Sequence, residues 1–219
     1  MRRPAPTGCE LHEDVRGSAA IRSWVDLPIA LSGRHVNARI FTFRGLQDGR
    51  EHIAIGLGSF RRPLGGVPLV RVHSECLTGD VLGSRRCDCG PQLAEALELL
   101  DRHGGYLVYL RQEGRGIGLY AKVEAYRLQN QGMDTYAANR ALGFREDARD
   151  YAAAALMLEA LGVRRIDLLT GNPDKVTQLA DRGIEIREVR RTGRHETPEN
   201  VRYLATKQAV GHLFDPPED

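Results

Sequence analysis

The sequence predicts a mixed α/β (α+β) fold in one domain, with a β-rich first third and alternating helices and strands in the remainder. Three observations carry this prediction. Residues 38–60 hold two stretches of alternating apolar residues joined by a polar turn, without a helical period. From residue 67 onward, strand-like apolar runs alternate with helical patterns. The length of 219 residues suffices for one substantial core but is short for two full catalytic domains.

The individual elements follow from apolar spacing and from the residues at their ends. We expect strands at 38–45, 52–60, 67–74, 106–112, 164–170 and 185–190, and helices at 91–104, 117–131, 147–162, 172–183 and from about 200. Pro91 and Pro173 suit first helical positions, and Gly104 and Gly162 suit helix ends. Asp147 is expected to cap the helix over 147–162.

The ends of the chain and its charge balance exclude several classes of protein. Residues 1 to about 22 are expected to form a loosely ordered polar leader and residues 215–219 a loose tail, around one domain at 23–214. The 31 Lys and Arg residues nearly balance the 29 Asp and Glu residues, so we expect no nucleic-acid partner. No apolar run approaches the roughly 18 residues of a membrane helix, and the N-terminus lacks a signal-peptide core. We therefore expect a cytoplasmic protein without membrane contact.

The cysteines form the first candidate site. Cys76, Cys87 and Cys89 fall within fourteen residues, and a chain without a secretory signal is expected to keep them reduced. Three thiolates can hold Zn²⁺ and leave a fourth position open, as in catalytic zinc sites. Two alternatives remain open from the spacing: a closed zinc site completed by His73 or Cys9, and three thiols without a metal. Cys9, in the leader, is expected to be a free thiol.

A glycine-rich segment suggests a second reading. Glu113-Gly-Arg-Gly-Ile-Gly118 follows an expected strand and precedes an expected helix, which is the context of a dinucleotide-binding loop. The third glycine of that pattern would fall at Leu119, however, so the match is weak. No Gly-Lys-Ser/Thr sequence is present, which excludes a P-loop. A nucleotide-binding oxidoreductase and a non-catalytic, zinc-stabilised nucleotide-binding protein therefore stay as alternatives to a zinc hydrolase.

Several motifs, in a fixed order across residues 67–213, resemble the GTP cyclohydrolase II family. They include Arg71-Val-His-Ser-Glu-Cys-Leu-Thr-Gly-Asp80, Arg86-Cys-Asp-Cys-Gly-Pro-Gln-Leu93, Arg111-Gln-Glu-Gly-Arg-Gly-Ile-Gly-Leu119, Asp147-x-Arg-Asp-Tyr151 and Asn200-x-x-Tyr-Leu-x-Thr-Lys207. The resemblance implies an enzyme that opens the imidazole ring of GTP and releases formate and pyrophosphate. The implied product is 2,5-diamino-6-(5-phosphoribosylamino)pyrimidin-4(3H)-one, an intermediate of riboflavin biosynthesis.

The same resemblance implies a role for individual residues. The implied ligands of one catalytic Zn²⁺ are Cys76, Cys87 and Cys89. Asp147 matches the proton acceptor, Arg149 the nucleophile or phosphate-activating group, and Tyr126 a tyrosine beside C8 of guanine. The residues implied to bind GTP are Arg71, Val72, His73, Ser74, Glu75, Gln92, Glu113, Gly114, Arg115, Thr135, Thr170 and Lys175. Mg²⁺ is expected to accompany the triphosphate, and the family implies a homodimer.

Judged from residue type alone, these side chains have simpler explanations. Asp147 fits a plain helix cap, Arg149 and Lys175 fit surface cations, and Tyr126 fits a half-buried core position. Arginine stays protonated, which favours electrostatic activation of the α-phosphate at least as much as a covalent adduct. Gly171 stands where the family usually has Asn. A diverged relative that serves secondary metabolism, or that stops at a formylated intermediate, therefore stays open.

Overall fold

A seven-stranded mixed sheet forms the centre of the computed structural model, which describes residues 19–145 and 147–214. The strands are β1 (Ala20–Leu31), β2 (Arg34–Arg44), β3 (Ile53–Leu57), β4 (Leu69–Ser74), β5 (Gly105–Leu110), β6 (Arg165–Leu169) and β7 (Glu185–Arg190). Their order across the sheet is β1-β2-β3-β5-β4-β6-β7. The pairs up to β3 with β5 are antiparallel, whereas β5, β4, β6 and β7 run parallel. The expected β-rich first third and alternating remainder are confirmed.

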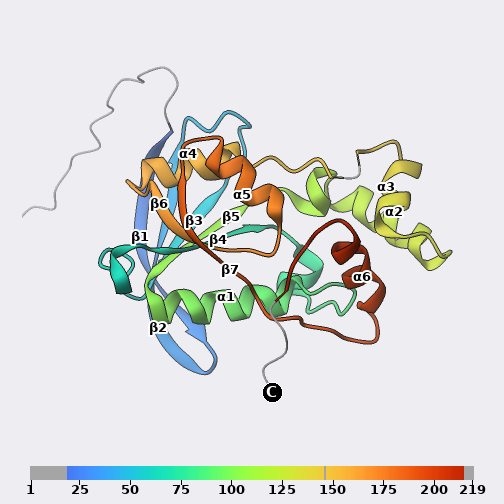
Figure 1. The fold of residues 1–219 in the computed structure, drawn as a ribbon, viewed down its shortest axis with the longest axis horizontal. Helices are drawn as coiled ribbons and strands as arrows, with labels where there is room; N and C mark the ends of the chain where they lie inside the picture. Colours follow the sequence, from blue (N-terminus) through green and yellow to red (C-terminus); the bar gives the residue numbers. More distant parts are fainter. Residues whose placement is uncertain (1–18, 146, 215–219) are drawn as a thin grey trace, which may run out of the picture.

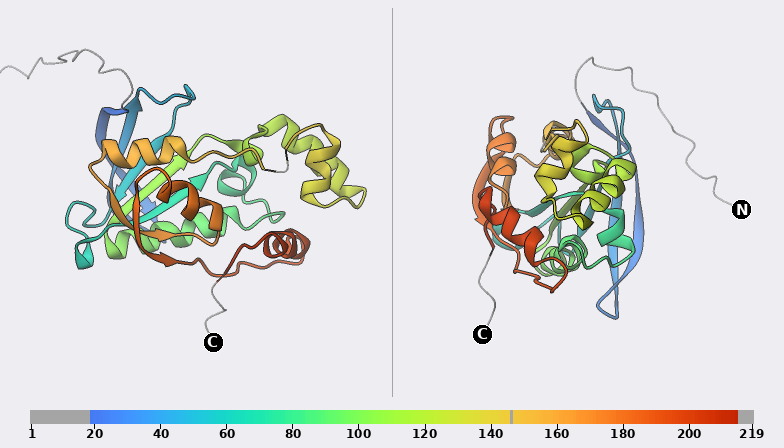
Figure 2. Two further views of the ribbon diagram at one scale, coloured as in Figure 1. Left: turned by 45° about the horizontal axis from the view of Figure 1, so that its top comes forward. Right: turned by 90° about the vertical axis from the view of Figure 1, so that its right-hand side faces the viewer.

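Helices cover both faces of the sheet and extend beyond one end of it (Figure 1). They are α1 (Cys89–His103), α2 (Leu119–Asn130), α3 (Thr135–Ala141), α4 (Ala152–Ala160), α5 (Pro173–Ala180) and α6 (Val201–Ala209). Helix α1 lies on one face, and α4 and α5 lie on the other (Figure 1). The helices α2 and α3 lie across from α6 at the far end of the molecule, as Figure 2 shows. In the described part of the chain, no helix has the length and apolar character needed to cross a membrane.

Two apolar cores fix the sheet between these helices. Because side chains alternate along a strand, Val70 and Val108 face α4 and pack in one core with Met157. Leu107, next to Val108, points to the opposite face and packs with Leu100 of α1 in the second core. Burial on both faces explains why the parallel strands β4, β5 and β6 read as nearly continuous apolar runs.

Strand β1 corrects the expected start of the domain. No strand was expected before residue 38, and residues up to 22 were assigned to the leader, yet β1 begins at Ala20. Most side chains of this edge strand are exposed, among them Trp24 at 52%. An exposed strand carries no inward apolar alternation, so its pattern gave no signal. Cys9 and the tail at 215–219 lie outside the described residues.

The expected helix over 147–162 is wrong at its N-terminal end. Helix α4 begins only at Ala152, and Asp150 Oδ1 accepts a hydrogen bond from Ala152 N at 2.5 Å. Asp147 therefore does not cap this helix and belongs to the preceding loop. Helix α3 was not expected; Asp134 caps it by accepting from the backbone N–H of Tyr136 at 2.8 Å.

Candidate active site

The three thiols meet beyond the carboxyl end of β4. The strand ends at Ser74 and leads to Cys76, and the turn that starts α1 brings back Cys87 and Cys89. All three Sγ atoms lie within 4.8 Å of one another, and those of Cys76 and Cys87 are 3.7 Å apart. In open α/β sheets, the carboxyl ends of the strands are where ligands bind.

The donor set and its spacing fit a zinc ion. Tetrahedral Zn²⁺ with Zn–S bonds of about 2.3 Å separates its sulfur ligands by about 3.8 Å, close to the distance between Cys76 and Cys87. Hydrogen bonds from Cys87 and Cys89 lower the pKa of Cys76, and the Lys122 ammonium at 3.1 Å from its Sγ adds to this effect. The hydrogen bond with Cys76 in turn raises the pKa of Cys87 to about 11.

His73 is not part of this cluster. Its Nε2 lies 3.1 Å from both carboxylate oxygens of Asp80, which also accepts hydrogen bonds from the Tyr109 hydroxyl and from Cys76 N. Desolvation lowers the pKa of His73. His73 thus supports the turn that carries Cys76, while Cys9, the other alternative fourth ligand, lies outside the described residues.

Glu113 ties the glycine-rich loop to the thiol cluster. Its Oε2 accepts from Leu77 N at 2.6 Å, and its Oε1 accepts from Lys122 Nζ at 2.7 Å and from Gly114 N at 2.8 Å. Arg115 has a φ of 60°, a left-handed conformation that is uncommon outside glycine. Its buried Nη1 has no hydrogen-bond partner, so the loop holds a cationic donor free for another group.

Tyr126 reaches the thiol cluster from α2. Its hydroxyl lies 3.2 Å from Thr78 Oγ1, which in turn lies 3.7 Å from the Sγ of Cys76. Burial raises the pKa of Tyr126, so the phenol is a neutral hydrogen-bonding group at neutral pH. A pocket lined by the thiols, Glu113, Arg115 and Tyr126 opens at this point.

A second pocket adjoins the first and gathers positive charge. Arg71, Arg149, Lys175 and Lys207 all line it, and Arg149 and Lys207 line the first pocket as well. Lys175 Nζ donates to Val72 O at 2.7 Å. Desolvation, together with the neighbouring cations, lowers the pKa of Lys175. A buried concentration of cations of this kind is suited to a multiply charged anion.

Arg149 and Asp147 form a tight ion pair in the loop before α4. Arg149 Nε lies 2.9 Å from Asp147 Oδ1, and Arg149 N donates to the same oxygen at 3.0 Å. Burial would raise the pKa of Asp147, but the hydrogen bonds and charge of Arg149 outweigh it and leave that pKa lowered. Arg149 lines both pockets, whereas Asp147 lines neither.

Comparison with known proteins identifies the family. The family model described as GTP cyclohydrolase II matches residues 25–191. The chain belongs to the GTP cyclohydrolase II family. It is 50% identical to "GTP cyclohydrolase-2" of Vibrio parahaemolyticus serotype O3:K6 over 193 residues, which are 88% of this chain and 96% of the relative. "GTP cyclohydrolase-2" of Psychromonas ingrahamii is 50% identical over 195 residues, 89% of this chain and 96% of the relative. "Riboflavin biosynthesis protein RibBA" of Thermotoga maritima is 52% identical over 178 residues, 81% of this chain and 45% of that protein.

The structure brings most of the residues implied by the GTP cyclohydrolase II resemblance to the two pockets. The first pocket is lined by Ser74, Glu75, Cys76, Cys87, Cys89, Glu113, Gly114, Arg115, Tyr126, Thr135 and Arg149. The second is lined by Arg71, His73, Ser74, Gln92, Arg149, Thr170 and Lys175. Val72 is the exception besides Asp147, because its side chain is buried in the core and only its carbonyl faces Lys175.

Sequence reasoning did not single out several residues that line the pockets, and Lys122, Tyr203 and Lys207 are three of them. Lys122 contacts both the Cys76 thiol and Glu113. Tyr203 and Lys207 of α6 line both pockets. The last two stand in the Tyr-Leu-x-Thr-Lys motif, which was the available signal, but nothing local in that motif points to the thiol cluster.

Proposed function

We propose that this chain hydrolyses GTP, opening the imidazole ring and releasing formate and pyrophosphate to leave 2,5-diamino-6-(5-phosphoribosylamino)pyrimidin-4(3H)-one. The observation that carries the proposal is the adjacency of a three-thiol cluster and a pocket lined by four cations. Ring opening needs hydroxide at one end of the substrate, and binding of a triphosphate needs positive charge at the other. Membership of the GTP cyclohydrolase II family supports the same reaction.

The thiols of Cys76, Cys87 and Cys89 would hold one Zn²⁺. When bound, the ion supplies Lewis acidity and makes hydroxide available near neutral pH. Tyr126, hydrogen-bonded to Thr78 beside the cluster, is placed to orient the guanine C8 edge or a ring-opened group through its hydroxyl. The Glu113 carboxylate fixes the backbone next to Cys76 by accepting from Leu77 N.

The second pocket, called the cationic pocket below because Arg71, Arg149, Lys175 and Lys207 line it, would hold the triphosphate together with Mg²⁺. Arg149 lines both pockets, so it is suited to the α-phosphate, which lies between the ribose and the departing pyrophosphate. Its guanidinium stays protonated, and we propose that it activates the phosphate electrostatically. Asp147 orients Arg149 through their ion pair; as proton acceptor it would have to exchange that partner during the reaction. Lys175 and Arg71 would bind the outer phosphates.

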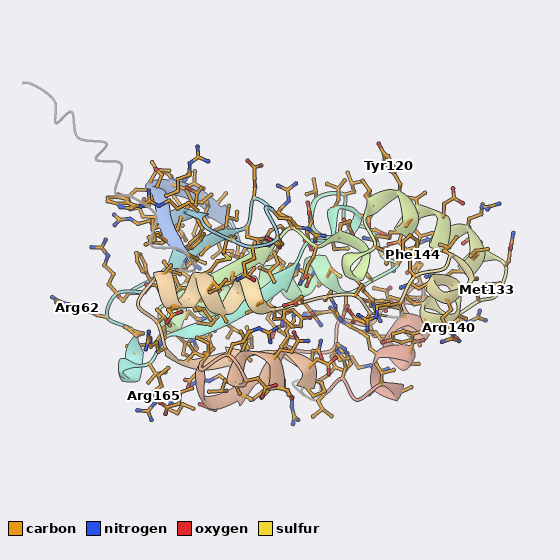
Figure 3. The ribbon with its side chains drawn as sticks, turned by 90° about the horizontal axis from the view of Figure 1, so that it is seen from above. Arg62, Tyr120, Met133, Arg140, Phe144 and Arg165 are labelled. Carbon is orange, nitrogen blue, oxygen red and sulfur yellow. The ribbon has the colours of Figure 1, made fainter. Side chains whose placement is uncertain are left out.

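We propose that the protein acts as a homodimer in the cytoplasm. Reduced thiols are stable in a reducing compartment. Apolar side chains are exposed at the α2–α3 end: Tyr120, which projects from the molecule in Figure 3, is 88% exposed, and Met133 and Phe144 are each 41% exposed. Surface of this kind supports association with a second copy.

The reaction is tested by incubating the purified protein with GTP, Mg²⁺ and Zn²⁺. Formate, pyrophosphate and the pyrimidine product are measured separately, and equal amounts of the three are expected. A formylated product without free formate would indicate an enzyme that stops after the first ring cleavage. GTP binding without any product would refute catalysis, and Cys87→Ser serves as the matched inactive control.

A further inference from the structure

The residue between two of the thiols has no role in the reaction described so far. Asp88 separates Cys87 from Cys89, and it is completely buried, with 0% of its surface exposed. A buried carboxylate is costly unless it is paired and hydrogen-bonded. Its presence in the turn over residues 87–89, the thiol turn, therefore requires strong partners.

Three hydrogen bonds to two side chains satisfy Asp88. Lys207 Nζ lies 2.8 and 2.9 Å from its two oxygens, and Gln92 Nε2 donates to it at 2.7 Å. Gln92 Oε1 in turn accepts from Arg71 Nη2 at 2.8 Å, and Arg71 Nη1 donates to Leu169 O at 3.1 Å. The thiol turn is thus connected to α1, to β4 and, across 119 residues of sequence, to α6.

The ion pair is one of two buried attachments of helix α6. Of the residues in Val201–Ala209, only Leu204 and Lys207 are buried. Leu204 supplies an apolar anchor, and Lys207 supplies the charged one. The same helix places Tyr203 and Lys207 at the walls of both pockets.

We propose that the Lys207–Asp88 ion pair is a positioning device that holds the turn 87–89 in its metal-binding geometry and seats α6 over the substrate pockets. Lys207 is thus a positioning residue that acts through Asp88 on the zinc ligands, and the inference rests on the proposed zinc site. Removing Lys207 would leave a buried carboxylate without its cation, which forces the turn to move or to admit water. Substitution of groups that orient metal ligands typically weakens metal binding by about 10- to 100-fold.

The chain offers a matched control in the same two segments. Arg85 Nη2 and Glu199 Oε2 form an ion pair at 3.0 Å between the segment just before the thiol turn and the residues just before α6. Their side chains are 63% and 48% exposed, so solvent screens this pair. Arg85→Met removes a cation that bridges the same segments without stranding a buried charge.

The test measures zinc release to an excess of a chromophoric chelator, without GTP. From zinc-loaded protein, Lys207→Met is expected to release zinc about 10- to 100-fold faster than the wild type. Arg85→Met is expected to stay within about twofold of the wild type, because solvent already screens its exposed pair. Release by Lys207→Met within twofold of the wild type would overturn the proposal.

A double variant separates the ion pair from a loss of packing at α6. Asp88→Asn combined with Lys207→Met restores a neutral pair, since the amide of Asn can still accept from Gln92. The double variant is expected to release zinc more slowly than Lys207→Met alone, and multiplicative effects of the two substitutions would overturn the coupling. If Lys207→Met does not fold, rescue of folding and zinc loading by Asp88→Asn supports the proposal, and failure of rescue overturns it. A wild type that loads zinc but opens no GTP would refute the proposed function and leave this coupling standing.

Discussion

Replacing Gly171 by alanine is expected to displace residues 212–214, which line the cationic pocket together with Gly171. A Cβ atom on Gly171 would lie 1.9 Å from the carbonyl oxygen of Leu213, whose N–H donates to Gly171 O at 2.9 Å. Contacts of Cβ atoms stay above 3.0 Å, so the segment must move by at least about 1 Å. The φ of Gly171 lies outside the left-handed range, so the strain of an alanine at this position comes from its contact with Leu213.

The expected loss of stability is modest and measurable. Breaking one backbone hydrogen bond costs about 1 kcal/mol net. Partial exposure of Phe214, which lines the pocket, adds up to about 1 kcal/mol. For a domain of this size, a total of roughly 1–2 kcal/mol lowers Tm by about 2–8 °C. His212 lines the same pocket as Lys175, so the KM for GTP should rise as well.

Thermal unfolding and steady-state kinetics check this prediction. The matched control is Gly193→Ala, where the nearest atom to a new Cβ is 3.8 Å away and no effect is expected. A chain truncated after Gly211 lacks the opposing carbonyl, so Gly171→Ala should have no further effect there. If Gly171→Ala lowered Tm equally in the truncated chain, the assigned contact with Leu213 would be wrong.

Three further sets of substitutions test the site. Cys87→Ser is expected to lose bound zinc while Cys9→Ser keeps one zinc per chain, and elemental analysis measures both. Lys175→Met should raise the KM for GTP more than it lowers kcat. Burial lowers the pKa of Lys175, so unfolding takes up a proton between that pKa and 10.5; the free energy of unfolding of the wild type should rise relative to Lys175→Met as pH increases through this window. Urea unfolding at several pH values measures it, and a falling difference would contradict it. Arg149→Ala is expected to slow pyrophosphate release more than formate release, and Asp147→Asn the reverse, in single-turnover assays; strictly proportional losses would argue against separate roles.

Local spacing in the sequence predicted the parts of the site that lie close together in the chain. Cys76, Cys87 and Cys89 stand within one strand end and one turn, so their convergence was expected from spacing, and the structure confirms it. The strand over 185–190 and the helix begun by Pro173 were predicted correctly for the same reason. Periodicity and end-capping residues act over one or two turns of chain.

Residue type alone gives the wrong environment for side chains whose surroundings come from distant segments of the chain. Lys175 would ordinarily be a surface cation, and only the family motif marked it, yet the structure buries it beneath Val72 O. Asp147 fits a helix cap by sequence, but its carboxylate pairs with Arg149, and α4 begins only after Tyr151. A propensity describes the average environment of a residue type, and packing decides the actual one.

The sequence by itself determined the fold class, the order of most elements and the thiol cluster, because these depend on apolar periodicity and on ligands spaced within one loop. Only the tertiary structure decided that β1 forms one edge of the sheet and that Lys207 pairs with the buried Asp88. It alone also decided that Leu213 packs against Gly171, where a Cβ atom would clash. Each of these contacts joins residues that are far apart in the chain or that carry no apolar pattern. Their partners are set by how the layers pack, and that information is absent from any short window of sequence.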